Sequence, residues 1–104
     1  MKQYKIMMTE PATRDLQQIS DYIAIELREP ATAKKLINKI KEQVMSLVEF
    51  PARHALVADE RIAAKGIRQL LIDNYIVFYI VSEKDNIVVI IRILYGRREW
   101  EHLL

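Results

Sequence analysis

The sequence predicts an α+β domain: an N-terminal strand, an αα-hairpin packed on one face of a mainly antiparallel sheet, and a short C-terminal helical tail. Two stretches with helical spacing fill the first half of the chain, and three apolar stretches with short polar joints fill the second. Only two glycines and three prolines interrupt the 104 residues. A chain of this length can bury one hydrophobic core, so residues 1–104 are expected to form a single domain.

The composition is that of an ordinary globular protein, with 51% apolar and 29% charged residues. No stretch approaches the roughly 18 consecutive apolar residues of a membrane helix, and the N-terminus lacks the apolar region of a signal peptide. We therefore expect a cytoplasmic protein without membrane contact. The absence of cysteine excludes disulfides, thiolate metal sites and cysteine nucleophiles. A formal net charge of +2 gives no general argument for nucleic-acid binding.

The chain begins with a predicted short strand over residues 4–8. Thr9 is expected to cap a helix over about residues 10–28, because Pro11 is tolerated in a first turn, where amide donors lack partners. Apolar residues recur along this helix at spacings of three and four, at Ala12, Leu16, Ile19, Ile23 and Leu27. The polar residues off this stripe are expected to face solvent: Asp15, Gln18, Asp21 and Arg28.

A second helix is predicted to begin at Pro30, because the residue before a proline is disfavoured in a helix, and to end at Phe50-Pro51. Its apolar stripe is Ala33, Ile37, Ile40, Val44 and Leu47. The joint between the two helices is short, so they must fold back on one another as a hairpin. Four lysines are expected on the outer, solvated side of the second helix, at Lys34, Lys35, Lys39 and Lys41.

Residues 52–65 show no clear period, although Asp59 to Lys65 could form a helical turn. Loops of this length are often functional. His54 lies in this stretch and could act as a general base near neutral pH. The alternative is a solvated loop histidine without a role.

Three strands are predicted in the last third of the chain, at 67–73, 75–82 and 87–95. Their joints, Asp73-Asn74 and Glu83 to Asn86, are so short that neighbouring strands must be antiparallel. The last two strands are almost continuously apolar, which predicts central positions in the sheet. Gly96 is expected to end the final strand, and residues 97–104 to form one or two helical turns.

Familiar catalytic, cofactor and metal motifs are missing from the sequence. We therefore expect neither a cofactor nor a metal. A set of cationic residues remains, consisting of Arg61, Lys65, Arg68, Arg92, Arg97 and Arg98. Guanidinium groups that converge at one sheet edge could hold a phosphate or a carboxylate. The alternative is that Arg92 and Arg98 pair with acidic residues, with Asp73, Glu99 and Glu101 as the candidates.

Two aromatic residues, Tyr95 and Trp100, lie beside the arginines of the tail. An aromatic ring next to guanidinium groups can stack on a base or anchor a protein partner. Alternatively, Trp100 could pack its ring on the open end of the sheet.

In the order and spacing of several motifs, the sequence resembles the RelE/ParE superfamily of toxins from type II toxin–antitoxin systems over almost the whole chain. These motifs are A-x-x-D-L-x-x-I-x-x-Y-I from Ala12 to Ile23, then G-I-R, Y-I-V-F-Y and R-I-L-Y-G-R-R-E-W. The resemblance implies a helical hairpin on an antiparallel sheet. It also implies a cognate antitoxin, a small acidic DNA-binding protein, through which alone the toxin would contact operator DNA.

One activity that the resemblance implies is cleavage of mRNA on the ribosome, as in RelE-type toxins. Arg68 and Arg98 match two cationic catalytic positions of that type, whereas Leu70, Ile76 and Leu104 stand where a lysine, an arginine and a tyrosine are expected. Metal-free RNA cleavage needs a base, a cation and an acid, and aliphatic side chains supply none of them. A nuclease would have to recruit substitutes, for which Arg61, Tyr95 and His54 are the candidates.

The other activity is inhibition of DNA gyrase by protein–protein binding, as in ParE-type toxins, which are not known to be enzymes. The helix motif and the R-R-E-W tail resemble this type more closely, although Glu99 replaces a more usual aspartate and Tyr95 a common histidine. The target-binding residues would be Tyr95, Arg97, Arg98 and Trp100. A third possibility is an inactive family member that retains antitoxin binding or a DNA-binding accessory role.

Overall fold

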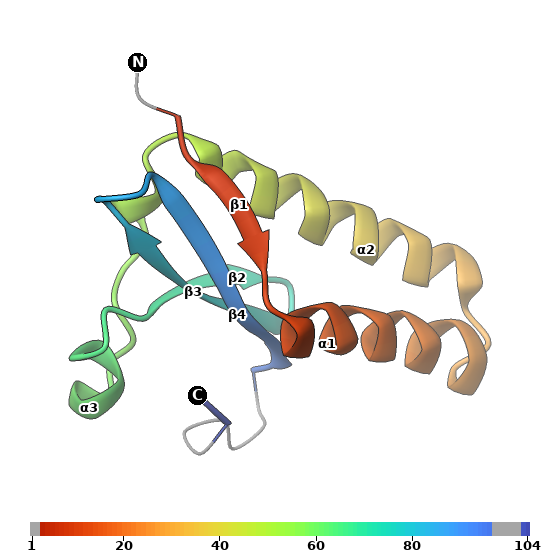
Figure 1. The fold of residues 1–104 in the computed structure, drawn as a ribbon. Coiled ribbons are helices and arrows are strands. Elements are labelled where there is room, and N and C mark those ends of the chain that lie inside the picture. The colour runs from red at the N-terminus through yellow and green to blue at the C-terminus, as the bar shows by residue number, and fades with distance from the viewer. Residues whose placement is uncertain (1–2, 97–102) are drawn as a thin grey trace.

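The computed structural model describes residues 3–96 and 103–104 and has the predicted α+β architecture. A four-stranded sheet in the order β1-β4-β3-β2 carries a helical hairpin, α1 and α2, on one face (Figure 1). The two helices meet at the tip of the hairpin and diverge toward β1 (Figure 1). In the described part of the chain, none of the helices combines the length and the apolar character needed to cross a membrane.

The first strand, β1 (Lys5–Met8), pairs in parallel with the last strand, β4 (Ile87–Tyr95). The sequence predicted antiparallel neighbours only where the joints are short. The connection from β1 to β4 includes most of the chain, so it places no such restriction on their direction. The mainly antiparallel sheet therefore has one parallel edge strand.

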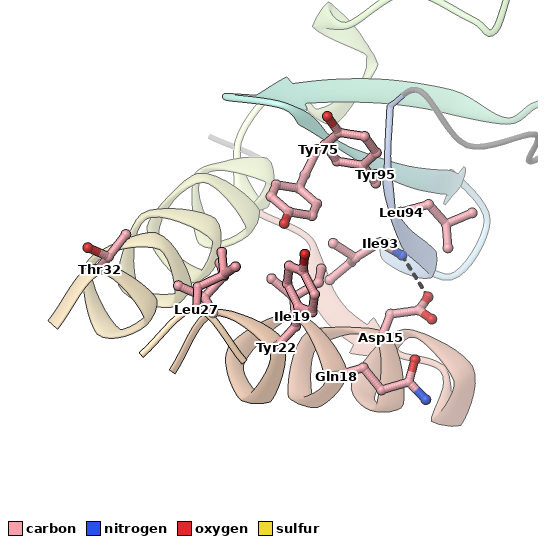
Figure 2. A pocket seen from close by; sticks show the side chains of 11 residues that line it. Asp15, Gln18, Ile19, Tyr22, Leu27, Thr32, Tyr75, Ile93, Leu94 and Tyr95 are labelled. Atoms are coloured by element: carbon pink, nitrogen blue, oxygen red, sulfur yellow. Dashed lines mark hydrogen bonds between the residues drawn. The ribbon is translucent and has the colours of Figure 1, made fainter. Parts of the chain in front are cut away.

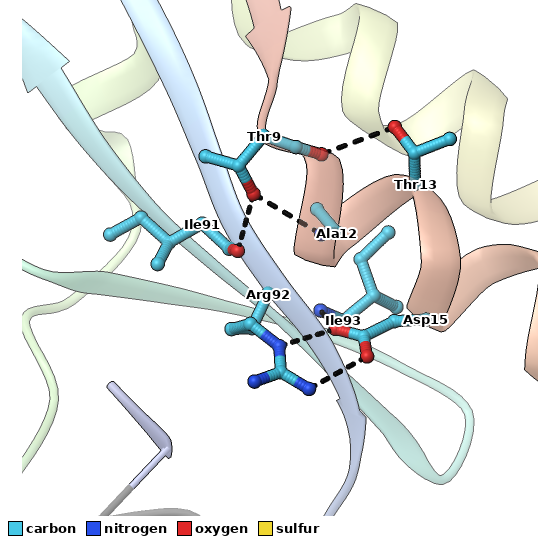
Figure 3. Close-up of polar contacts among 7 residues, drawn as sticks. All are labelled: Thr9, Ala12, Thr13, Asp15, Ile91, Arg92 and Ile93. Carbon is cyan, nitrogen blue, oxygen red and sulfur yellow. Dashed lines mark hydrogen bonds and ion pairs between the residues drawn. The ribbon is translucent and has the colours of Figure 1, made fainter.

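Helix α1 (Glu10–Asp21) begins as predicted. The Thr9 hydroxyl accepts a hydrogen bond from the Ala12 amide at 3.1 Å, and Pro11 lies in the first turn. The same hydroxyl donates to the carbonyl oxygen of Ile91 on β4 at 2.7 Å (Figure 3). One side chain thus caps the helix and fixes its start against the sheet.

The end of this helix differs from the prediction. From Tyr22 the helix widens into a π-helical segment, η1 (Tyr22–Glu26), in which the Leu27 amide donates to the Tyr22 carbonyl at 3.1 Å. A π-turn contains more residues than an α-turn, so the α-helical spacing no longer predicts which side chains face the core. Leu27, expected to continue the buried stripe, is 51% exposed.

The second helix, α2 (Pro30–Met45), starts at the predicted proline and buries Ala33, Ile40 and Val44. It runs into a short 3-10 turn, η2 (Ser46–Val48), and a further one, η3 (Pro51–Arg53), follows. All four lysines of α2 are exposed, as expected, but the ammonium of Lys39 also contacts Asp73 at 2.7 Å. The helical turn expected near residue 60 is α3 (Glu60–Ala63), where Asp59 accepts hydrogen bonds from the amides of Arg61 and Ile62.

The remaining strands are β2 (Arg68–Ile72) and β3 (Tyr75–Ser82). β3 pairs antiparallel with β2 on one side and with β4 on the other. The predicted central positions of β3 and β4 are confirmed. Asp73 and Asn86, in the two predicted turns, have positive φ angles of 52° and 54°. Both residue types tolerate this conformation, which explains the tight reversals.

Two hydrophobic clusters lie on opposite faces of the sheet. The cluster under the helices contains Ala12, Ile40, Val44, Leu47, Leu70, Ile72, Val77, Tyr79, Val88, Ile90 and Ile93. The other contains Val57, Ile62, Ile67, Ile76, Phe78 and Leu94, with Leu103 and Leu104 packed against it. The second face is therefore covered by α3, its flanking loop and the last two residues. The predicted helical tail falls largely on residues 97–102, which lie outside the described residues.

Candidate functional site

Asp15 is the main correction to the predicted surface. It was expected to face solvent but is 5% exposed. Arg92 donates from Nε and Nη2 to its two carboxylate oxygens at 2.7 and 2.8 Å, and the Ile93 amide donates at 3.0 Å (Figure 3). The hydrogen bond that Arg92 donates to Asp15 raises the pKa of Arg92. Arg92 is thus paired as its alternative interpretation required, but its partner is none of the three acids proposed.

The arginines of the described chain do not form one cationic cluster. Arg92 is held by α1, whereas Arg68 on β2 donates from Nη1 to the His54 carbonyl oxygen at 2.7 Å. Arg61 on α3 is exposed and lies 3.9 Å from Asp59. Lys65 is also exposed, just after α3. The idea of guanidinium groups converging at one edge is therefore not supported for these residues.

His54 is half-buried rather than fully solvated. Its Nε2 is buried and has no hydrogen-bond partner in the described part of the structure. The ring stands edge-on to Tyr79, with the two centroids 6.3 Å apart, and the Tyr79 hydroxyl donates to the Pro51 carbonyl at 2.6 Å. Burial and the nearby charge of Arg53 lower the pKa of His54.

This environment predicts an acid-sensitive fold. The unfolded chain takes up a proton on His54 at about pH 6.5, whereas the folded chain resists it until a lower pH, so stability is lost as pH falls below about 6.5. Urea denaturation at several pH values should show this slope. In the His54→Gln variant the slope between pH 7 and 5 should be smaller, because the titrating imidazole is gone. An identical slope in both proteins would contradict the assignment to His54.

The three aliphatic residues that the resemblance matches to RelE-type catalytic positions pack in the core. Leu70 is buried beneath the helices, and Ile76 is buried on the other face of the sheet. Leu104 packs against the same cluster as Ile76. At these three positions the chain has apolar side chains that contribute to the hydrophobic clusters, and it has no reactive group there.

Tyr95, at the end of β4, borders a hollow in the described surface. Its ring packs edge-on against Tyr75, with centroids 5.7 Å apart, and it remains 41% exposed. The hollow has a volume of about 640 Å³ and lies between α1, η1 and the ends of β3 and β4 (Figure 2). We call it the tyrosine hollow, lined by Asp15, Gln18, Ile19, Tyr22, Ile23, Leu27, Thr32, Tyr75, Ile93, Leu94 and Tyr95.

Of these lining residues, only Tyr95 was singled out as a binding residue from the sequence. In the sequence Tyr22 was recognised only as part of the family motif, although a large aromatic residue off the apolar stripe of its helix is itself an indication of a binding surface. The other predicted contacts, Arg97, Arg98 and Trp100, lie outside the described residues. Among residues 3–96 and 103–104, no three histidine or acidic side chains gather as a metal site would require.

A family model described as the ParE toxin of the type II toxin-antitoxin system, parDE, matches residues 6–100. The chain belongs to the ParE toxin family. The predicted membership of the RelE/ParE superfamily, on the ParE branch, is thereby confirmed. A comparison with curated proteins gave no match.

Solved structures agree with this ParE-family assignment. The chain is similar to one in a chromosomal ParDE toxin–antitoxin system from P. aeruginosa, with 25% identity over 91% of this chain and 98% of that one, and a TM-score of 0.73. It shares its fold with a chain of the RelBE2 toxin–antitoxin complex from Mycobacterium tuberculosis, at 21% identity over 91% and 93% of the two chains and a TM-score of 0.67. The fold is therefore common to ParE-type and RelE-type proteins, and the choice between their activities depends on the residues.

Proposed function

We propose that this ParE-family toxin arrests growth by binding DNA gyrase and that a cognate antitoxin neutralises it. The observation that carries the proposal is the burial of Leu70 and Ile76 and the packing of Leu104 at positions where RelE-type nucleases have reactive side chains. A nuclease would need polar groups at these places or substitutes recruited from elsewhere in the chain.

The polar candidates that remain are poorly arranged for RNA cleavage. Arg68 is tied to the His54 carbonyl, and a guanidinium stays protonated, so it cannot take a proton from a ribose hydroxyl. The Nε2 of His54 is buried, and the imidazole ring packs against Tyr79. Arg61 supplies a charge but neither base nor acid. We therefore propose a binding protein rather than an enzyme.

The proposed contacts with gyrase are Tyr95, Arg97, Arg98 and Trp100. Tyrosine, tryptophan and arginine are the residue types that contribute most to protein–protein affinity, because they combine a large apolar area with polar groups. Tyr95 already presents an exposed ring beside an apolar hollow.

The antitoxin is proposed from the relatives, because both similar structures come from toxin–antitoxin systems. It would be a small acidic protein with a DNA-binding end, and operator DNA would be contacted only through it. A neighbouring reading frame of that description would support this part of the proposal.

The test is to induce the chain in cells and to assay the purified protein. We expect growth arrest, loss of gyrase-dependent supercoiling and intact ribosome-bound mRNA. Cleavage of mRNA at codons with normal supercoiling would replace the proposal with the ribosome-dependent nuclease, to which Arg68 and Arg98 would belong. Normal growth would contradict both toxin activities and favour the inactive family member.

A further inference from the structure

We infer that the tyrosine hollow is part of the target-binding surface and receives one bulky apolar side chain of the target protein. This inference rests on the proposed function and extends its contact surface from Tyr95 to the helical hairpin. It adds Tyr22 and Leu27 to the proposed contacts and names the chemistry of the group that they bind.

The hollow has the size and lining of a binding pocket. Pockets of about 300–1,000 Å³ with mostly apolar walls and a few polar groups are typical of specific sites. Here the volume is about 640 Å³, and Tyr22 and Leu27 on the hairpin side are 55% and 51% exposed. Covering these exposed apolar side chains with a partner removes them from water and so favours binding.

The π-helical segment creates the hairpin side of this pocket. A continued α-helix would be expected to keep Leu27 on the buried stripe, whereas η1 leaves both Tyr22 and Leu27 at the hollow. π-Turns have less regular hydrogen bonding than α-turns and occur frequently at functional sites. Thus the irregularity in the hairpin and the hollow coincide.

Three tyrosines give the hollow its specificity. Tyr22 and Tyr75 point toward one another across it, and Tyr95 stands beside Tyr75 (Figure 2). Burial, followed by the neighbouring Tyr95 and Tyr22, raises the pKa of Tyr75, which agrees with phenol groups lying close together. Their rings offer apolar and aromatic surface, so a phenyl, indole or branched aliphatic side chain fits best.

The position of the hollow favours the target as its occupant. Tyr95 leads directly into Gly96, whose amide donates to the Asn74 carbonyl at 2.8 Å, and this bond fixes where the chain leaves the sheet. The next two residues in the sequence are Arg97 and Arg98, which the proposed function assigns to the target. One segment of the target could therefore fill the hollow and meet the arginines.

The test compares three variants in a gyrase supercoiling assay with purified gyrase. The double variant Tyr22→Ala/Leu27→Ala should need at least ~10-fold more protein for half inhibition, because two central apolar contacts are truncated. The matched control is Leu71→Ala, which removes a 65% exposed leucine of β2 that does not line the hollow; it should inhibit like the wild type.

A variant that fills the hollow distinguishes a lost contact from a loss of folded structure. Thr32→Trp adds an indole to an exposed position of the hollow without removing a core contact, and it should weaken inhibition to a similar extent. Circular dichroism should show folded protein for this variant. If the double and filling variants both inhibit like the wild type, the hollow is not a target contact and only this inference fails.

Other results separate the two proposals. A wild-type protein that does not inhibit gyrase would remove the proposed function, and this inference with it. Full inhibition by the double variant combined with lost neutralisation by the antitoxin would assign the hollow to the antitoxin and overturn the inference. Self-association of the wild type that the Thr32→Trp change abolishes, with inhibition intact, would assign it to a second copy.

Discussion

Replacement of Asp15 with asparagine is expected to lower the free energy of unfolding by about 3–5 kcal/mol. The carboxylate accepts two hydrogen bonds from Arg92 and one from the Ile93 amide, and all three come from β4. The variant would leave the guanidinium of Arg92 partly buried without a countercharge, which costs more than the loss of a surface pair. Domains of this size have a total stability of about 5–15 kcal/mol, so the variant should be close to unfolding at 37 °C.

Urea denaturation of the purified proteins measures this effect. The matched control is Arg14→Gln, which breaks the exposed contact between Arg14 and Glu10 on the same helix, at 3.9 Å, and should leave the midpoint almost unchanged. The double variant Asp15→Leu/Arg92→Met should recover part of the loss, because no buried charge remains unpaired. Equal stabilities of wild type and Asp15→Asn would show that the pair does not hold α1 on the sheet.

The variant Arg97→Ala/Arg98→Ala is expected to abolish growth arrest while the protein remains folded. The described core clusters and the buried ion pair contain neither arginine, so we expect the fold to be retained. Without the two guanidinium groups the proposed interface would lose its strongest polar contacts.

Growth curves after induction, together with thermal denaturation of the purified variant, measure the two effects separately. Lys34→Ala/Lys35→Ala is the matched control, because it removes two adjacent positive charges from the exposed face of α2 and should leave toxicity unchanged. Full toxicity of a folded arginine variant would refute the tail as the target-binding site.

The sequence was informative wherever local rules decide the structure. Thr9 and Pro11 identified the start of α1, and the turns at Asp73 and Asn86 fixed the antiparallel hairpins of the sheet. Asp15 was misplaced because its burial depends on Arg92, which lies 77 residues further along the chain. A helical period can rank Asp15 only against its neighbours in α1, and this polar residue is buried because it is paired.

The candidate site was less predictable than the fold. Tyr95 was found from its place beside the arginines, but the tyrosine hollow also needs Tyr22 from the hairpin and Tyr75 from β3. Leu27 was assigned to the core because regular α-helical spacing does not anticipate a π-turn. The hollow therefore arises from tertiary contacts and one local irregularity, and neither appears as a motif in the sequence.

The pairing of the first strand with the last also affects how the chain folds during synthesis. β1 pairs with β4, and the hydrogen-bond partners of the Thr9 hydroxyl and the Asp15 carboxylate on the sheet lie in residues 91–93. These contacts cannot form until β4 has been synthesised. Contacts between such distant residues form slowly, and a strand without its neighbour exposes unpaired backbone. The helical hairpin is therefore expected to remain undocked during synthesis until β4 has left the ribosome. During that interval a partner could reach the apolar side of the hairpin before the sheet covers it.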